Sequence, residues 1–343
     1  MNHSLTFRSL RSATCVALLA IFGISTSCAQ AQDQDKAAAR SAKPVAATKA
    51  AKPAAAVKAK AKAKTATKDK AATKDKAQAR PSDAYLRISE TEDGQPKAME
   101  TAIVRFTGLP GSQYEGRTVD LVGVVHIGQR EYYQDLKKRL AKYDVVLYEL
   151  VAPDGTRIRP EDLEDRRGVL GSMQSGMKDL LNLEYQLEHI DYLADNFRHA
   201  DMSPEEFMQD MESRGDGLWK MAARMMGAGI ATQSTSGGDA GLLMAMLSPD
   251  RAMRLKQVMS RQLADVDAVT AGMDDETGTN TLIKGRNRKA FEVLREELEA
   301  GKKSLAVFYG AGHLSDMAER LEKEFAMKPT KTTWLAAWDL QRN

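Results

Sequence analysis

Cysteine is nearly absent from this sequence. The chain of 343 residues has two cysteines, Cys15 and Cys28, and both lie before residue 31. Disulfides and thiolate metal ligands are therefore excluded from the rest of the chain. No segment matches the phosphate-binding loop G-x-x-x-x-G-K-[ST], a dinucleotide fingerprint, or the nucleophile elbow G-x-S-x-G between a strand and a helix. These absences leave histidine, carboxylate and arginine side chains as the candidates for chemistry.

Aromatic residues are missing from residues 33–80, where alanine and lysine dominate. The only apolar side chains larger than alanine in this segment are Val45 and Val57. Such a segment cannot bury enough surface to offset the entropy of ordering the chain. We therefore expect a disordered or transiently helical tether over residues 32–80.

The net charge of the tether is opposite to that of the remaining chain. The tether has fourteen Lys or Arg against four Asp, a net charge of +10, and the residues before it add +2. Because the whole chain carries +3, residues 81–343 carry −9. An acidic folded part argues against nucleic acid as a partner, whereas the tether could contact an anionic cell wall or membrane surface. The alternative is a solvated spacer that binds nothing in particular.

Residues 1–31 have the pattern of a secretory signal peptide. Arg8 and Arg11 precede an apolar core, and Ala-Gln-Ala at 29–31 forms an A-x-A cleavage site. The core has about twelve apolar residues, fewer than the ~20 that cross a bilayer, so no transmembrane span is expected in the mature chain. We expect an exported protein, periplasmic or secreted, and a lipid anchor through Cys28 stays open.

Two apolar runs, at 119–125 and 145–150, flank an amphipathic stretch and predict a βαβ unit. The first run is followed by His126 in the motif Gly123-x-x-His126. The second run contains one carboxylate, Glu149. An ionised carboxylate among valines and leucines must be paired, bound to a metal or neutralised.

A second strand followed by Gly-x-x-His is predicted near the end of the chain. The apolar run 304–310 ends at Gly310, His313 follows, and a helix is expected from about residue 315. Open α/β sheets bind ligands outside the C-terminal ends of their strands. We therefore expect His126 and His313 to lie close together, although 187 positions separate them.

The predicted fold class is α/β, with a mixed central sheet built from these two strand, Gly-x-x-His, helix units. Residues 81–343 form the folded domain, and a large helical insertion occupies about 166–300. Helix starts are indicated at Ser203-Pro204 and Ser248-Pro249. Further predictions are strands at 84–89, 102–107 and 332–338 and a long helix over 281–300.

Taken together, the two G-x-x-H motifs and the strand glutamate resemble the TraB/GumN/TIKI family. The resemblance covers residues 100–343, and Arg286-Asn287 fits an Arg-Asn pair that the family has on a helix before its second motif. One departure is Gly285, where family members often have an acidic residue. The resemblance implies a fold related to erythromycin-esterase-like and haem-binding ChaN-like proteins, and in the TIKI branch a metal-dependent peptidase activity.

Two imidazoles and one carboxylate are three ligands for a divalent cation that leaves a fourth position to water. We therefore predict that His126, Glu149 and His313 bind zinc, manganese or cobalt, and that Glu149 and Arg286 have catalytic roles. Arg286 would bind an oxyanion or a substrate carboxylate. Gly123, Gly310 and Asn287 are the predicted substrate-binding residues. The alternative is a buried ion pair between Glu149 and Arg286, with both histidines hydrogen-bonded to backbone.

Other candidates have simpler interpretations. His189 and His199 are expected in surface or capping roles, and Asp201 as a carboxylate at a helix entry. A group of methionines is interpreted either as ordinary core or as a peptide-gripping groove: Met221, Met225, Met226, Met244, Met246 and Met253.

Three classes of function follow from the sequence. The first is a metal-dependent hydrolase acting on peptides in the periplasm. The second is a non-catalytic periplasmic binding protein for haem, a metal ion or a signalling peptide. The third is a structural protein that works through its tether. A general acid or base beside the metal would separate the first class from the second.

Overall fold

The structure is a computed structural model that describes residues 85–153, 156, 180–215, 241, 244–264, 274 and 278–341. The predicted signal peptide and tether lie outside these residues. So do Met221, Met225, Met226 and five parts of the predicted insertion at 166–300, namely residues 166–179, 216–240, 242–243, 265–273 and 275–277. No helix within the described ranges is both long and apolar enough to cross a membrane.

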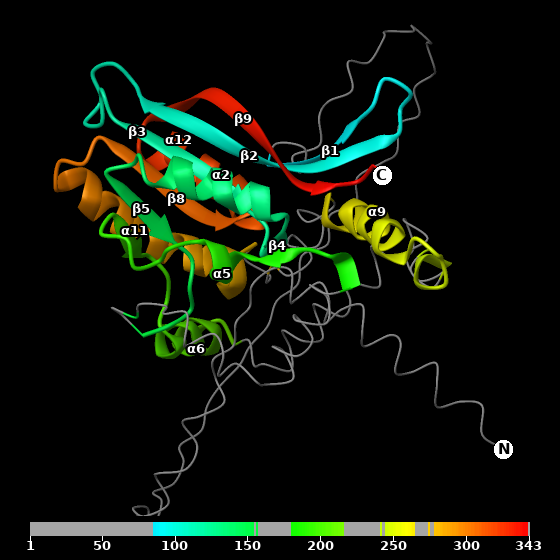
Figure 1. The fold of residues 1–343 in the computed structure, drawn as a ribbon. Coiled ribbons are helices and arrows are strands. Elements are labelled where there is room, and N and C mark those ends of the chain that lie inside the picture. The colour runs from blue at the N-terminus through cyan, green and yellow to red at the C-terminus, as the bar shows by residue number, and fades with distance from the viewer. Residues whose placement is uncertain are drawn as a thin grey trace, which may run out of the picture. The chain divides into compact units, whose positions relative to one another are not determined.

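A seven-stranded mixed sheet is the centre of the fold (Figure 1). The strand order is β1-β2-β3-β8-β5-β7, and β9 also pairs with β2. The predicted α/β class with a mixed central sheet is confirmed. The strands are β1 (Leu86–Glu90), β2 (Pro96–Gly108), β3 (Thr118–Val124), β5 (Val145–Tyr148), β7 (Phe197–His199), β8 (Ser304–Gly310) and β9 (Met327–Asp339).

The central strands run parallel, with β8 between β3 and β5. Helix α2 (Arg130–Leu140) connects β3 to β5. The predicted strand-helix-strand connection is therefore confirmed, but the two strands are not neighbours. Each is apolar enough to be covered on both faces, so either can accept β8 as a partner.

The antiparallel part of the sheet consists of β1, β2 and β9. The strands predicted at 84–89, 102–107 and 332–338 are confirmed, although β2 and β9 are longer than expected. Strand β2 begins at Pro96, since a proline without an N–H group is tolerated at the first position of a strand.

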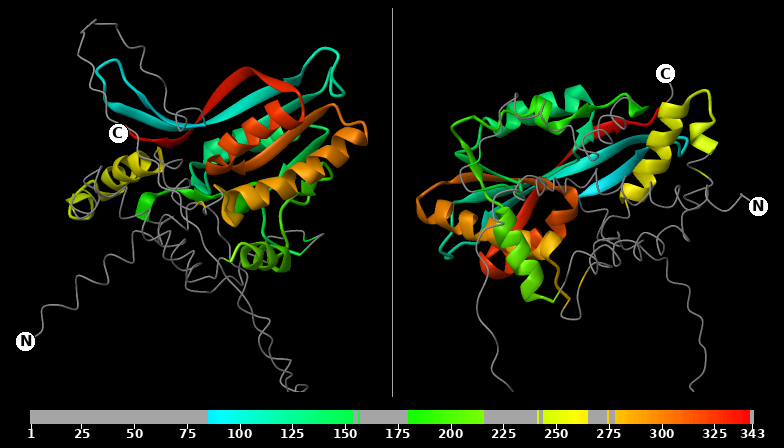
Figure 2. Two further views of the ribbon diagram at one scale, coloured as in Figure 1. Left: turned by 180° about the vertical axis from the view of Figure 1, so that it is seen from behind. Right: turned by 90° about the horizontal axis from the view of Figure 1, so that it is seen from below.

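Helices cover both faces of the sheet (Figure 2). Helix α2 packs on Val122 and Val124, whereas α11 (Arg286–Glu299) and α12 (Leu314–Glu324) pack on the face of Val119 and Leu121. Alternate residues of β3 thus face opposite layers, which is why the strand is apolar throughout.

The predicted helical insertion also contains strands, which corrects the sequence prediction. Besides α5 (Gln186–His189), α6 (Pro204–Ser213) and α9 (Arg251–Ala264), it supplies β7 to the sheet and β6 (Glu184–Tyr185) to a pair with β4 (Ile127–Gly128). These strands have two or three residues, too few to produce a recognisable alternation.

Helix starts in the insertion agree with the predicted signals. Ser203 and Glu206 form a capping box on α6, and α9 follows Ser248-Pro249 closely. The helix predicted over 281–300 begins instead with a π-helical turn, η2 (Thr281–Gly285), before α11. Met244 and Met246 are exposed and Met253 is half-buried, so the first two are not core residues within the described part.

Candidate functional site

The C-terminal ends of β3, β5 and β8 bring His126, Glu149 and His313 together, as the sequence predicts. Glu149 follows β5 directly, His126 follows β3 after one residue, and His313 ends the 3-10 turn η3 (Ala311–His313) after β8. A Cβ atom on Gly310 would lie 3.3 Å from Glu149 Oε2, 3.7 Å from His126 Nε2 and 3.8 Å from His313 Cδ2. The three side chains therefore surround one glycine.

Both carboxylate oxygens of Glu149 have partners. Oε1 accepts a hydrogen bond from Arg286 Nη2 at 2.8 Å, and Oε2 accepts one from the Gly310 N–H at 2.7 Å. His313 Nε2 lies 3.5 Å from Oε1. Burial raises the pKa of Glu149, but the charges of Arg286 and His313 outweigh burial and hold the pKa well below its usual range. Glu149 is therefore an ionised carboxylate.

Arg286 joins Glu149 to a second buried carboxylate, Asp201. Its Nε atom donates to both Asp201 oxygens at 3.0 and 3.2 Å, and Nη2 donates to Oδ2 at 2.5 Å. The side chains of Arg286 and Asp201 are 2% and 0% exposed. Burial lowers the pKa of Arg286, but Asp201 and Glu149 outweigh burial and raise it. Two carboxylates against one guanidinium leave a charge of −1, which a nearby cation or imidazolium would compensate.

Asp201 is the functional residue that sequence reasoning missed, because it was assigned to a helix entry. It follows β7 by two positions, and β7 lies beside β5 in the sheet. Asp201 thus obeys the same strand-end rule as Glu149. Recognising Phe197–His199 as a strand would have found it.

Asn287 fixes the orientation of His313. Its amide nitrogen donates to the His313 carbonyl oxygen at 3.0 Å and to Asp316 Oδ2 at 2.9 Å, so its oxygen is left to accept from His313 Nδ1 at 2.7 Å. Neutral His313 then carries its proton on Nδ1 and directs an unprotonated Nε2 towards Glu149. Two such acceptors repel unless a proton or a cation lies between them.

Asn287 is fully buried, and its hydrogen bonds position His313; the substrate contact predicted for Asn287 stays a prediction. The alternative to a metal site is a buried ion pair between Glu149 and Arg286, with both histidines hydrogen-bonded to backbone, and the structure shows only part of it. The Glu149–Arg286 ion pair is present, but His313 Nδ1 is bonded to a side chain and not to backbone.

His126 supplies the second imidazole of the site. Its Nε2 atom is buried and has no hydrogen-bond partner among the described residues. Burial lowers the pKa of His126, against an opposing effect of Glu149. A neutral imidazole can offer Nε2 to a cation, and a Cβ atom on Gly310 would lie 3.7 Å from this atom and 3.3 Å from Glu149 Oε2.

Gly123 differs from Gly310 in its surroundings. A Cβ atom at Gly123 would lie 3.2 Å from the Ala102 carbonyl oxygen and 3.2 Å from Leu314 Cδ2. The missing side chain thus permits close packing of β3 on β2 and α12. These contacts give Gly123 a packing role, and the substrate contact predicted for it stays a prediction.

At Gly285, where the resembled family often has an acidic residue, the structure places the carboxylate of Asp210 instead. A Cβ atom there would lie 2.8 Å from Asp210 Oδ2, a contact that is too short to be tolerated without movement. Asp210 of α6 is held by Arg214 at 2.7 Å, Thr281 at 2.8 Å and Arg288 at 2.7 Å. A carboxylate from another helix therefore lies beside the residue that precedes Arg286.

The acid stability of the protein is expected to depend on Asp210. Burial raises the pKa of Asp210, but Arg214, Arg288 and Thr281 outweigh it and lower the pKa from 3.8 to about 2. This depressed carboxyl stabilises the fold above pH 3.8, and the contribution is lost as the pH falls towards 2. We expect Asp210→Asn to lower the free energy of unfolding at pH 7 by about 1 to 2 kcal/mol.

Urea unfolding of Asp210→Asn at pH 7 and below pH 4 measures this contribution. The exposed Asp195→Asn is the control. The difference in stability between Asp210→Asn and the unmodified protein should shrink on acidification. A difference that stays constant with pH would contradict the assignment.

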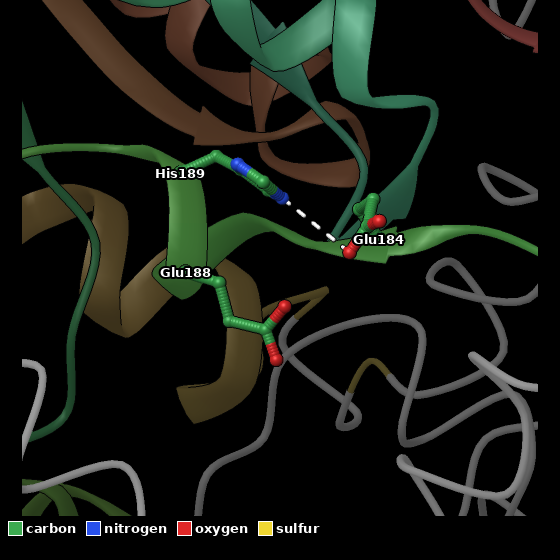
Figure 3. A group of neighbouring side chains, drawn as sticks. All are labelled: Glu184, Glu188 and His189. Carbon is green, nitrogen blue, oxygen red and sulfur yellow. Dashed lines mark ion pairs between the residues drawn. The ribbon is translucent and has the colours of Figure 1, made fainter.

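The two histidines outside the site have different surroundings. His199, the last residue of β7, has its Nε2 atom 2.6 Å from the carbonyl oxygen of Leu150, which follows β5. The ring of His189 stacks on that of Tyr133, with the ring centroids 5.9 Å apart. Figure 3 shows His189 directed towards Glu184, and His189 Nε2 lies 3.4 Å from Glu184 Oε2. Glu184, Glu188 and His189 form a possible metal-binding group. Among the described residues it is the only group of three or more His, Cys, Asp or Glu side chains whose ligand atoms, one from each, all lie within 4.8 Å of one another.

This Glu184–Glu188–His189 group departs from the simple surface role predicted for His189. Glu184 is also paired with Arg130 at 3.1 Å, and Glu188 is exposed. Partly exposed acidic groups of this kind are common without a metal. The group is therefore weak support for a cation site.

Comparisons of this chain with protein-family models, with curated proteins and with solved structures found no match. The site is accordingly interpreted from its own geometry.

Proposed function

We propose that this chain is an exported, TraB/GumN-like metal-dependent hydrolase that acts on peptides and has an erythromycin-esterase/ChaN-like fold. The observation that carries the proposal is the convergence of His126, Glu149 and His313 on Gly310. They lie at the C-terminal ends of three neighbouring parallel strands, where open α/β sheets bind ligands.

The chemistry of these donors fits a divalent cation such as zinc, manganese or cobalt. His126 Nε2 is buried without a partner, His313 Nε2 is unprotonated when the ring is neutral, and Glu149 is ionised. A Cβ atom on Gly310 would fill the space between the three side chains, so the glycine keeps that space open. The donor atoms are more widely spaced than in the Glu184–Glu188–His189 group, so binding of one cation by all three residues requires their side chains to move.

A bound divalent cation would supply a Lewis acid that polarises a peptide carbonyl and acidifies a water molecule. The protein's own residues prepare the donors. Asn287 sets the tautomer of His313, and Arg286 keeps Glu149 ionised and oriented. The predicted contact of Arg286 with an oxyanion would depend on Nη1, because Nε and Nη2 are already bonded to carboxylates.

A second candidate function is a non-catalytic periplasmic binding protein for haem, a metal ion or a signalling peptide. One observation favours it: Glu149 and Asp201, the carboxylates that contact Arg286, are both committed to that residue. Neither is therefore free to act as a general base. The third class, a structural protein working through the tether, concerns residues outside the described ranges.

Metal content and peptide hydrolysis of the full-length protein test the proposal together. His126→Ala and His313→Ala are each expected to lower the affinity for zinc, manganese or cobalt by about 100-fold or more, because each removes a ligand. Hydrolysis of a mixed peptide substrate should be lost in parallel. Inductively coupled plasma spectrometry after dialysis measures the bound metal.

His189→Ala is the matched control, because it removes an imidazole from the Glu184–Glu188–His189 group. Metal that is lost only in His189→Ala would place the cation in that group and contradict the proposal. Metal bound through His126 and His313 without hydrolysis of any peptide would favour the binding protein.

A further inference from the structure

A cavity of about 260 Å³ lies at the opposite ends of the parallel strands from the candidate site. Its lining includes Ser304, the first residue of β8, whereas Gly310 at the candidate site is the last residue of that strand. Arg139, Lys142 and Tyr143 line it from the end of α2 and the turn that follows. The cavity is therefore separate from the site described above.

The sheet supplies a row of charged residues to this cavity. In the strand register, Arg105 of β2 pairs with Asp120 of β3 on one side and with Lys331 of β9 on the other. Directly paired residues of neighbouring strands point to the same face of a sheet. Arg105, Asp120 and Lys331 therefore lie side by side on the face that α2 covers.

Arg105 is held in a defined orientation. Its Nε and Nη2 atoms donate to the two oxygens of Asp120, each at 2.8 Å, and the Tyr143 hydroxyl donates to Asp120 Oδ2 at 2.6 Å. Asp120 is 2% exposed, whereas the Arg105 side chain is 44% exposed. The buried carboxylate thus anchors the guanidinium, and its third nitrogen, Nη1, makes no hydrogen bond within the described residues.

Positive charge exceeds negative charge in the lining. Asp120 balances Arg105, and Arg139 is paired with Asp135 outside the cavity at 2.9 Å. Lys142 and Lys331 form no ion pair with any described residue, so they add an uncompensated charge of +2. Charges of one sign on a concave surface concentrate the electrostatic potential in it.

We propose that this cavity binds a phosphate group. A phosphate dianion matches the two uncompensated lysine charges and offers acceptor oxygens to Arg105 Nη1 and to both ammonium groups. The cavity volume holds one phosphate with a small substituent. A soluble phosphate ester and a lipid headgroup share this chemistry, and the experiment below distinguishes them.

Calorimetric titration of the full-length protein with inorganic phosphate at low ionic strength tests the proposal. The variant Lys142→Gln/Lys331→Gln is expected to bind phosphate about tenfold more weakly, because it removes both uncompensated charges. The matched control is Lys137→Gln/Lys138→Gln, which removes two exposed lysines of α2 outside the cavity. All variants keep the lysine-rich tether, so its contribution to the measured binding is the same in each.

Weakening only in the cavity variant supports the proposal. Equal weakening in both variants, or none in either, would overturn it. Sedimentation with vesicles containing phosphatidic acid identifies the source of the phosphate group. Vesicle binding that depends on Lys142 and Lys331 indicates a lipid headgroup, whereas phosphate binding without it indicates a soluble ester.

Discussion

Replacing Arg286 with methionine is expected to lower the free energy of unfolding by about 3 to 5 kcal/mol at pH 7, because the change leaves two buried carboxylates without a counter-ion. Glu149 and Asp201 are 5% and 0% exposed, and Arg286 contacts both. Methionine has a similar length and no charge, so the lost stability comes more from the missing positive charge than from altered packing.

The pH dependence of this variant should identify the cause. Burial raises the pKa of Glu149, and without Arg286 the largest opposing charge is gone, so the pKa of Glu149 rises in the folded variant. A raised carboxyl pKa gives stability at low pH that is lost as the pH rises through that pKa. The stability deficit of Arg286→Met should therefore shrink between pH 7 and about pH 5.

Arg288→Met is the matched control for this measurement. Arg288 also belongs to α11 and also contacts a carboxylate, Asp210, but its side chain is 49% exposed. An exposed ion pair contributes about 1 kcal/mol or less. Chemical unfolding of both variants at pH 7 and pH 5 gives the comparison. Similar losses for the two would show that Arg286 is not the counter-ion of a buried charged cluster.

The meeting of His126, Glu149 and His313 was predictable because it depends on one rule. The apolar runs of β3, β5 and β8 identify buried parallel strands, and such strands carry their functional residues at the same edge. The histidines and the glutamate follow these strands within three positions. No knowledge of the strand order was required.

The position of β8 between β3 and β5 was not predictable in the same way. All three strands are apolar on both faces, so each can occupy any central place in the sheet. Their order is decided by pairing between segments that are distant in the sequence. Local patterns contain no information about such a choice.

The roles of Asp201 and Asn287 required the structure for different reasons. Asp201 follows a strand of three residues that includes Arg198, and this pattern does not indicate a buried strand. Asn287 is singled out in the sequence only as part of the Arg-Asn pair that resembles the family, which does not indicate its contact with His313. Neighbouring residues on a helix point about 100° apart, so Asn287 turns to His313 while Arg286 turns to Glu149 and Asp201.

Glu149→Gln is expected to separate metal binding from fold stability. If Glu149 were the only ion-pair partner of Arg286, this change would leave a buried guanidinium without a counter-ion. The structure reduces that cost, because Arg286 keeps three hydrogen bonds to Asp201. The side-chain NH₂ group of the glutamine would replace an acceptor oxygen and would face an N–H donor of Arg286 or Gly310. We therefore expect the free energy of unfolding to fall by about 1 to 2 kcal/mol.

The effect on metal affinity should be much larger than the effect on stability. A neutral amide is a poorer ligand than a carboxylate, and the variant also removes the residual charge of −1 from the Glu149, Asp201 and Arg286 cluster. We expect the affinity for a divalent cation to fall by about 100-fold or more. Melting temperature and bound metal, measured on the same samples, give the two effects independently.

His313→Ala completes the comparison, because it removes a predicted ligand and leaves the ion pair of Glu149 with Arg286 intact. If a cation lies between these residues, both variants lose metal, and Glu149→Gln retains most of its stability. Metal content that is unaltered in both variants, with a large loss of stability only in Glu149→Gln, would make the cluster a structural ion pair and end the hydrolase hypothesis. The two interpretations therefore differ in which measured quantity responds, and not only in how strongly it responds.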